Sequence, residues 1–291
     1  MTDLFTRRRR QDWTPSQRQR DRIAYRRRRT ARSYGIALVA SAIVLGAIVV
    51  VVGRSSGWPR FRDSFFDLSV GWRDLPDLLR ALWVNLQIMA VAEVVVLVFA
   101  AILATLRTLR GPVFFPLRFV AALYTDIFRG LPLLIVLVLV GYGLPSLRIA
   151  GTPSSPFVLA IIALVLTYSA YVAEVLRAGI ESVHPSQRAS ARALGLTYFQ
   201  SMRFVVFPQA VRRVLPPLLN DFVSLQKDTS LVSFLGVLDV TLTADNQQAS
   251  NFKFVSVIFA GLIFVALTIP LTRFTDWFAA RRGYINSGVI L

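Results

Sequence analysis

Six long apolar runs dominate the chain and are separated by shorter polar stretches. The hydrocarbon core of a bilayer, about 30 Å thick, needs about 20 apolar residues per helix. A helix also satisfies its own backbone hydrogen bonds in lipid. The 291 residues are 55% hydrophobic with a mean hydropathy of +0.56, which is typical of a multi-span membrane protein. We therefore predict an all-α polytopic membrane protein with about six transmembrane helices. The expected spans are 35–52, 84–106, 117–144 (interrupted at 129–132), 157–176, 210–240 (broken at 227–228) and 254–278.

The arginines predict the orientation of these spans. Twelve arginines against three aspartates lie between Met1 and Tyr34, directly before the first span, which we interpret as an uncleaved anchor. Such a tail contacts anionic lipid and keeps the N-terminus in the cytoplasm, and nucleic acid is not an expected partner. With this orientation, further arginines fall in the cytoplasm: Arg107, Arg110, Arg118, Arg188, Arg192, Arg203, Arg212, Arg213, Arg273, Arg281 and Arg282. We expect a multi-pass protein of the cytoplasmic (inner) membrane with both termini cytoplasmic. Residues 56–80 are expected outside, with an amphipathic piece over 58–77 at the interface.

Composition excludes several kinds of chemistry. The chain has no cysteine and one histidine, His184, so a zinc site or a Ser-His or Cys-His relay is not expected. Its two lysines, Lys227 and Lys253, do not follow a glycine, so the phosphate-binding loop G-x-x-x-x-G-K-[ST] is absent. We expect no catalytic residue, no metal and no cofactor in this chain. Energy for active transport would come from another subunit or from an ion gradient.

A polar stretch of almost forty residues, Glu174–Ala210, interrupts the apolar pattern on the expected cytoplasmic side. Pro185 suits the first turn of a helix, and a short helix is predicted over Gln187–Leu194. Ala189 and Ala193 share one face at i, i+4 spacing, and Gly195 supplies a left-handed stop. A structured segment of this length on a membrane protein is more typical of a docking surface than of a connector.

The same stretch resembles the coupling segment of importer permeases of the ATP-binding-cassette (ABC) class, with the pattern G-Q-x-E-A-A-x-A-L-G followed by I-L-P. The matching residues run SQRASARALG over 186–195 and VFPQA over 206–210. Ser186, Ala189 and Ser190 depart from the pattern, and Ala189 replaces its carboxylate. Three more stretches are similar to the polar amino-acid branch of that family. They are YTDIFRGLPLL over 124–134, YVAEVLRAGI over 171–180, and LPPLLN over 215–220 with KDTSL over 227–231.

The resemblance implies a layout and a set of partners. The domains would be a basic tail (1–34), an extra span with an external segment (35–75), a five-span importer core (76–285) with its coupling segment (181–209), and a C-terminal tail (286–291). Partners would be cytoplasmic ABC ATPase subunits, a second permease subunit (the same or homologous), an external solute-binding protein and an amino-acid substrate. The residues expected to contact the ATPase are Gln187, Ala189, Ser190, Ala191, Ala193, Leu194, Gly195 and Pro208.

Charged residues at membrane depth are the candidates for a translocation pathway. A charged side chain that faces lipid is energetically costly, so such residues are expected to face the protein interior or a water-filled path. They are Glu93, Asp126, Arg129, Glu174 and Asp221. Structural ion pairing is the alternative, and Asp126 and Arg129 are three residues apart on one helical face and could pair. Lys227 and Asp228 are expected to mark a bend with local pairing.

Two other functions fit parts of the sequence. A gradient-driven secondary transporter would need inverted repeats and a midplane ion site, and it leaves the polar segment 174–210 without a role. A membrane scaffold would use the arginine tail to recruit lipid or RNA. Deletion of residues 1–30 would abolish the activity of a scaffold and leave that of an importer.

Overall fold

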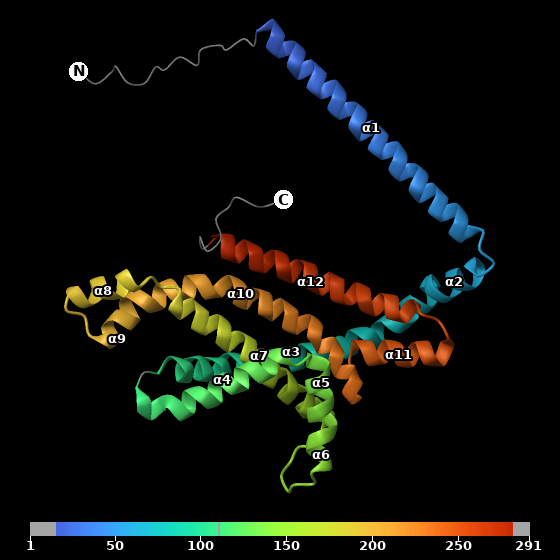
Figure 1. Cartoon of the computed structure of the whole chain (residues 1–291). Helices are drawn as coiled ribbons and strands as arrows, with labels where there is room; N and C mark the ends of the chain where they lie inside the picture. Colours follow the sequence, from blue (N-terminus) through green and yellow to red (C-terminus); the bar gives the residue numbers. More distant parts are fainter. Residues whose placement is uncertain (1–15, 110, 282–291) are drawn as a thin grey trace. The chain divides into compact units, whose positions relative to one another are not determined.

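The protein is built of helices (Figure 1). This computed structural model describes residues 16–109 and 111–281, and none of the described residues lies in a strand. The longer helices are α1 (Gln17–Gly53), α2 (Trp58–Phe65), α3 (Leu68–Thr108), α4 (Phe115–Gly130), α7 (Pro156–Glu181), α10 (Phe207–Asp228), α11 (Val240–Asn251) and α12 (Val255–Arg281). The shorter ones are α5 (Leu133–Val138), α6 (Leu144–Ser146), α8 (Pro185–Ala193) and α9 (Tyr198–Ser201). Arg110, Arg282, residues 1–15 of the basic tail and the C-terminal tail 286–291 lie outside the described residues.

The described residues divide into two compact units, with the boundary between Arg62 and Asp63. In the first unit, α1 joins the second half of the basic tail to the first expected span as one helix. The reason lies in the sequence between Gln17 and Tyr34, which has no proline or glycine and many arginines, and arginine is a good helix former. The apolar part of α1, within residues 32–53, is long enough to cross a membrane.

The expected interfacial piece over 58–77 is two elements instead of one. Helix α2 ends at Phe65, and α3 begins at Leu68. Asp67 caps α3, because its side chain accepts a hydrogen bond from the backbone N–H of Ser69 at 3.2 Å. An aspartate at this position satisfies a free N–H of the first turn and so favours a new helix start. Residues 68–77 therefore belong to the long helix α3.

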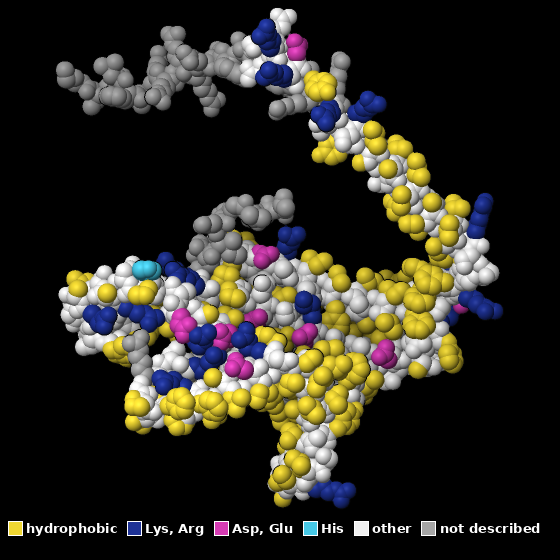
Figure 2. Space-filling view, viewed as in Figure 1, with side chains coloured by type: hydrophobic (Ala, Val, Ile, Leu, Met, Phe, Trp, Pro, Cys, Tyr) yellow, Lys and Arg dark blue, Asp and Glu magenta, His cyan; other side chains and the backbone are white. Residues whose placement is uncertain are grey.

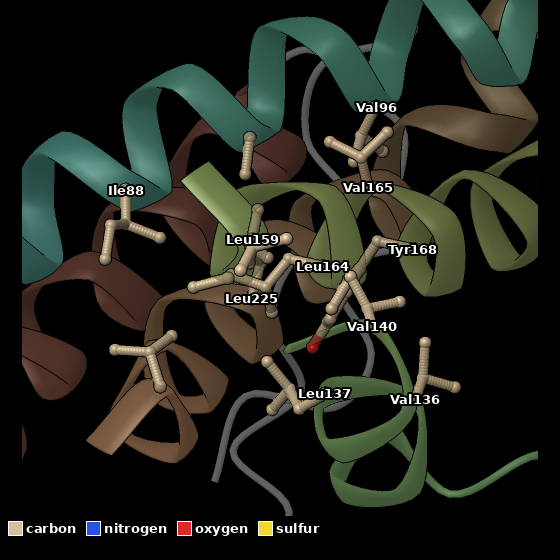
Figure 3. Packing of buried hydrophobic residues seen from close by; sticks show 14 of the residues in the cluster. Ile88, Val96, Val136, Leu137, Val140, Leu159, Leu164, Val165, Tyr168 and Leu225 are labelled. Atoms are coloured by element: carbon tan, nitrogen blue, oxygen red, sulfur yellow. The ribbon is translucent and has the colours of Figure 1, made fainter. Parts of the chain in front are cut away.

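The core of the second unit lies where α3 and α7 pack along each other, with α4, α5 and α10 around them. Helix α3 contributes Ile88, Ala92, Val96 and Ala100, which are spaced four apart and fully buried. Figure 3 shows Leu164 of α7 beside Leu225 of α10, with Leu137 and Val140 nearby. Small residues on α3 and α7, among them Ala160 and Ala163, permit this close approach of helices.

Among the described residues, four helices are long and apolar enough to cross a membrane, or five if the bent pair 112–130 and 133–146 is one span. The expected second, fourth and sixth spans correspond to α3, α7 and α12. The expected fifth span falls on α10 and the 3-10 segment Thr229–Leu235, which are not among the four. Helix α10 is too polar for that test because it carries Gln209, Arg212, Arg213, Asn220, Asp221, Gln226, Lys227 and Asp228.

The third expected span is sharply bent. The predicted interruption at 129–132 is present, since α4 ends at Gly130 and α5 starts at Leu133. The two parts meet at 108°. Pro132 has no backbone N–H to continue the helix and disfavours helical geometry at Leu131, which is extended here with ψ 133°. The element is therefore a broken span or a re-entrant loop.

Candidate functional site

The polar segment between α7 and α10 is folded, and its first element is α8. His184 caps this helix, since its side chain accepts from the backbone N–H of Ser186 at 3.2 Å. At the other end Gly195 has φ +79°. The N–H of Leu196 donates to Ala191 O at 3.1 Å, and the N–H of Gly195 donates to Arg192 O at 2.9 Å. This is the glycine stop that the sequence predicts, with its paired end-of-helix hydrogen bonds.

The predicted small-residue face is exposed. Most of the residues expected to contact a partner point outward: Gln187, Ala189, Ser190, Ala193, Leu194, Gly195 and Pro208. Ala191 is 2% exposed and instead packs inward. Sequence reasoning missed Tyr198 and Phe199, which are exposed, as Leu194 is, although each is a large hydrophobic residue. Exposed large hydrophobic side chains within one segment are consistent with an interaction site.

Local contacts hold the segment to the ends of α7 and α10. Val183, Val206 and Ala210 form a small buried cluster of their own, with Ile180 and Met202 packed against it. Arg188 of α8 donates from Nη2 to the carbonyl of Ile180 in α7 at 2.6 Å. Arg213 of α10 donates to the carbonyl of Ser182. Thr197 and Gln200 form a reciprocal cap at the start of α9, a pattern that stabilises a helix N-terminus.

Glu174 gathers arginines from three helices at the same end of α7. Arg107 of α3 donates to its Oε2 at 2.7 Å, and Arg177 binds its other oxygen. Arg129 of α4 lies 3.8 Å from Oε2. Arg177 also pairs with Glu181. Figure 2 shows basic and acidic side chains collected in this part of the molecule. The Glu174 side chain is 21% exposed, so this network is partly shielded from solvent and ties α3, α4 and α7 together.

The structure does not pair Asp126 with Arg129, as their spacing had suggested. Asp126 is exposed, and the carboxylate beside Arg129 is Glu174. The predicted break at Lys227 and Asp228 is present, because α10 ends at Asp228 and a 3-10 segment follows. The expected local pairing is replaced by a tertiary contact, in which Tyr168 donates to Asp228 Oδ2 at 2.7 Å.

Glu93 and Asp221 form a second charged feature in the middle of the helices. Both are partly buried, Glu93 on α3 and Asp221 on α10. The Oδ2 atom of Asp221 is buried without a hydrogen-bond partner. Within the described part of the chain, neither residue has a basic side chain within ion-pair distance. Two carboxyl groups in such a place are a site for a positively charged group.

A buried polar network, which sequence reasoning missed, joins α3 to the segment after α10. The side-chain amide of Asn85 donates to Thr229 O and Thr229 Oγ1 at 3.2 Å and to Asp239 Oδ2 at 3.1 Å. The backbone N–H of Val240 donates to Asn85 Oδ1 at 3.0 Å. Each partner is 144 or more positions from Asn85 along the chain, so no local sequence pattern predicts these contacts.

Over residues 16–109 and 111–281, no group of three His, Cys, Asp or Glu side chains could hold a metal ion.

Membrane-length helices, a folded polar segment between α7 and α10, and partly buried carboxylates without a basic partner are typical of a transporter's membrane component. The family described as "binding-protein-dependent transport system inner membrane component" matches residues 97–284. The Vibrio harveyi protein named "probable amino-acid ABC transporter permease protein PatM" is 36% identical over 217 residues, which are 74% of this chain and 96% of that protein. The "arginine transport system permease protein ArtQ" of Bacillus subtilis (strain 168) is 33% identical over 71% of this chain and 92% of its own.

A solved structure described as an amino acid ABC transporter with histidines agrees with these relatives. It is 32% identical, has a TM-score of 0.66, and is matched over 71% of this chain and 94% of its own. The chain belongs to the family of binding-protein-dependent transport system inner membrane components. It is a multi-pass permease subunit of an ABC importer, and ATP is hydrolysed by a separate subunit.

Proposed function

We propose that this chain carries an amino acid across the cytoplasmic membrane, driven by ATPase subunits that dock on the segment 181–209. The observation that carries the proposal is α8 itself, a capped helix with an exposed small-residue face between α7 and α10. Relatives named as amino-acid permeases support the substrate class. The permease subunit would act as a pair, either of identical or of homologous chains, and would receive its substrate from an external solute-binding protein.

The docking surface would be apolar and shallow. Ala189 and Ala193 present only methyl groups, so the α8 backbone can approach a groove closely. Leu194, Tyr198 and Phe199 supply hydrophobic area around that face, with Leu194 80% exposed. Ala189 stands where the family pattern has a glutamate. The contact would therefore depend on shape and burial more than on a charge at that position.

Motion at α8 would reach the membrane through the contacts of the segment. Arg188 of α8 donates to the carbonyl of Ile180 in α7, and the cluster of Val183, Val206 and Ala210 joins the end of α7 to the start of α10, so the three elements would move together. The network around Glu174 continues the connection to α3 and α4. This is the mechanical requirement of alternating access, in which closure of the ATPases tilts membrane helices.

The translocation pathway would pass the carboxyl groups of Glu93 and Asp221, which would face the ammonium group or a basic side chain of the amino acid. Asp126 and Arg129 are exposed on the single chain, so they would line the pathway or face the second permease subunit. Glu174 is the weakest of the pathway candidates, because its charge is already matched by arginines.

The proposed topology has six spans, with both termini and residues 185–208 in the cytoplasm and residues 56–80 outside. Helix α10 with its 3-10 extension would be the span that composition alone does not detect. Residues 1–34 and 35–75 would be additions to a five-span core over 76–285. In support, PatM is matched over 96% of its length but only 74% of this chain.

The test is a bulky side chain on the docking face. Ala193→Trp would fill the space that the ATPase groove needs and should abolish ATP-driven amino-acid uptake in proteoliposomes, while the permease still inserts and purifies. Ser154→Trp is the matched control, since Ser154 is exposed in the loop before α7 and should leave uptake unchanged. Normal uptake by Ala193→Trp would refute the docking surface.

A further inference from the structure

A cavity beside the coupling segment has a lining rich in arginine, and the proposed transport function gives these arginines no role. Its volume is about 240 Å³, and it lies where the end of α3, the start of α4, the end of α7 and the α8–α9 region meet. Its lining includes Arg107, Arg118, Arg188, Glu181, Tyr198 and Met202. A neighbouring cavity of about 180 Å³ shares Arg188, Tyr198 and Met202. The Arg188 side chain therefore borders both cavities.

The three arginines of the lining have donors to spare. Each guanidinium carries five N–H groups, and the protein uses few of them. Arg118 donates from Nη1 to Leu109 O at 3.0 Å, and Arg188 donates from Nη2 to Ile180 O. The Nε of Arg188 is buried and has no hydrogen-bond partner. A buried N–H of a charged group without an acceptor is costly, so an acceptor from outside the chain is expected there.

The charge of the lining selects an anion. Three guanidinium groups face one carboxylate, that of Glu181, which is already paired with Arg177. Arg107 is likewise engaged with Glu174, which leaves Arg118 and Arg188 as the main sources of positive charge for a ligand. Two planar, fork-shaped donors that converge on one cavity suit the tetrahedral oxygens of a phosphate group.

The surroundings favour a lipid as the source of that phosphate. The start of α4, from which Arg118 extends, exposes Phe115 (60%) and Phe119 (56%), and Val113 before it is 82% exposed. These side chains offer an apolar flank along which acyl chains can lie. Basic pockets between membrane helices at the cytoplasmic side are the places where anionic head groups bind.

We propose that this cavity binds the phosphate group of an anionic phospholipid and holds it between Arg118 of α4 and Arg188 of α8. Since Arg188 belongs to the coupling segment, an occupied cavity would link the position of α8 to α3 and α4. The cytoplasmic source of the lipid rests on the proposed topology, but the binding itself does not. A binding measurement therefore separates this proposal from the proposed transport function.

The experiment measures lipid retained by the full permease complex. The complex is reconstituted in nanodiscs of phosphatidylcholine with phosphatidylglycerol, released, and analysed by native mass spectrometry for bound phosphatidylglycerol. Arg118→Gln and Arg188→Gln should each lower retention about tenfold or more, the scale of one lost charge-assisted hydrogen bond. Arg212→Gln makes the same charge change on an exposed arginine of α10 and should retain lipid like the wild type.

Further arms keep the result decisive. Arg118→Lys keeps the charge but loses the fork, so it should retain lipid between the wild type and Arg118→Gln, and it serves if the glutamine variant does not assemble. Equal retention in the wild type and both Arg118 variants overturns the proposal. Complete displacement of phosphatidylglycerol by millimolar inorganic phosphate would assign the cavity to a free phosphate ion and overturn the lipid assignment.

Discussion

At the scale of single residues, the charged groups of the helices divide into two kinds. Glu174 has its charge matched by Arg107 and Arg177, whereas Glu93 and Asp221 are partly buried with no basic side chain within ion-pair distance among the described residues. The first arrangement stabilises a protein, because removing one partner leaves a shielded charge unmatched. The second arrangement lowers stability when no cation is bound, because the partly buried charges are not compensated. Uncompensated charges of this kind are typical of binding sites.

Glu174→Gln should therefore lower stability. Arg107 and Arg177 would lose their shared anion, and we expect a loss of about 1–3 kcal/mol for this partly shielded network. The measurement is thermal unfolding of the purified complex in one detergent. Asp77→Asn is the control, since the Asp77–Arg80 pair is exposed on both sides and should change stability by less than about 0.5 kcal/mol. Equal effects of the two substitutions would contradict the distinction.

Glu93→Gln should have the opposite profile. The glutamine keeps the shape of the side chain and removes a partly buried charge that has no basic partner among the described residues, so the complex should assemble with unchanged or higher stability. Uptake of a cationic amino acid should fall because the site loses charge. Uptake kinetics and thermal unfolding, measured on the same preparation, check both statements. Unchanged uptake together with unchanged stability would reject a role for Glu93 in the pathway and in the structure.

At the scale of elements, the crossing of α7 and α10 controls how the coupling segment is held. Gly179 is buried there, and a Cβ added to it would overlap Val214 of α10. The close approach brings together the ends of α7 and α10, which flank the segment. A glycine inside a helix lowers the stability of the helix relative to alanine. At Gly179 the close packing of α7 and α10 offsets this loss, because a larger residue would not fit.

Gly179→Ala should separate α7 from α10 and destabilise the complex by about 1–3 kcal/mol, the scale of overpacking in a filled core. Gly261→Ala in α12 is the matched control. Its added Cβ meets nothing within 4 Å, so alanine should be neutral or stabilising by up to about 1 kcal/mol there. Melting temperatures of the two variants give the comparison. Destabilisation of equal size at both glycines would contradict the packing argument.

At the scale of the whole molecule, topology is the property on which most of the functional argument depends. The chain has no cysteine, so a single introduced thiol reports one position without background. Ser186→Cys should resist an impermeant thiol reagent added to intact cells and react after the cells are opened. Ser56→Cys should react from outside in intact cells. Labelling of the Ser186 variant from outside would reverse the proposed orientation.

Local signals in the sequence predicted local structure well. Gly195 follows the end of α8 and has a positive φ. This helix end was predictable because a positive φ depends mainly on the residue itself and its immediate neighbours. The break at Pro132 was predictable for the same reason, but its 108° angle depends on tertiary packing.

Contacts between distant residues were not predictable from spacing. The three-residue spacing of Asp126 and Arg129 suggested a pair, yet Glu174, which follows Arg129 by 45 positions, is the carboxylate near that arginine. The Asn85 network joins residues that share no pattern. The sequence also could not show that Ala191 turns inward while Ala189 and Ala193 stay exposed, because that depends on where α9 and residues 202–206 pack against α8.

The stabilising contacts of the coupling segment have one more property, which is their short range along the chain. Its buried cluster, its caps and its two arginine-to-carbonyl hydrogen bonds all lie between Ile180 and Arg213. Structures dominated by such near-neighbour contacts form quickly. The segment should therefore fold soon after it leaves the ribosome, and it should fold in the same way when it is moved into another permease. If residues 180–213 were replaced by the corresponding segment of a related permease, the chimera should bind the ATPase of that relative and keep the substrate specificity of this chain.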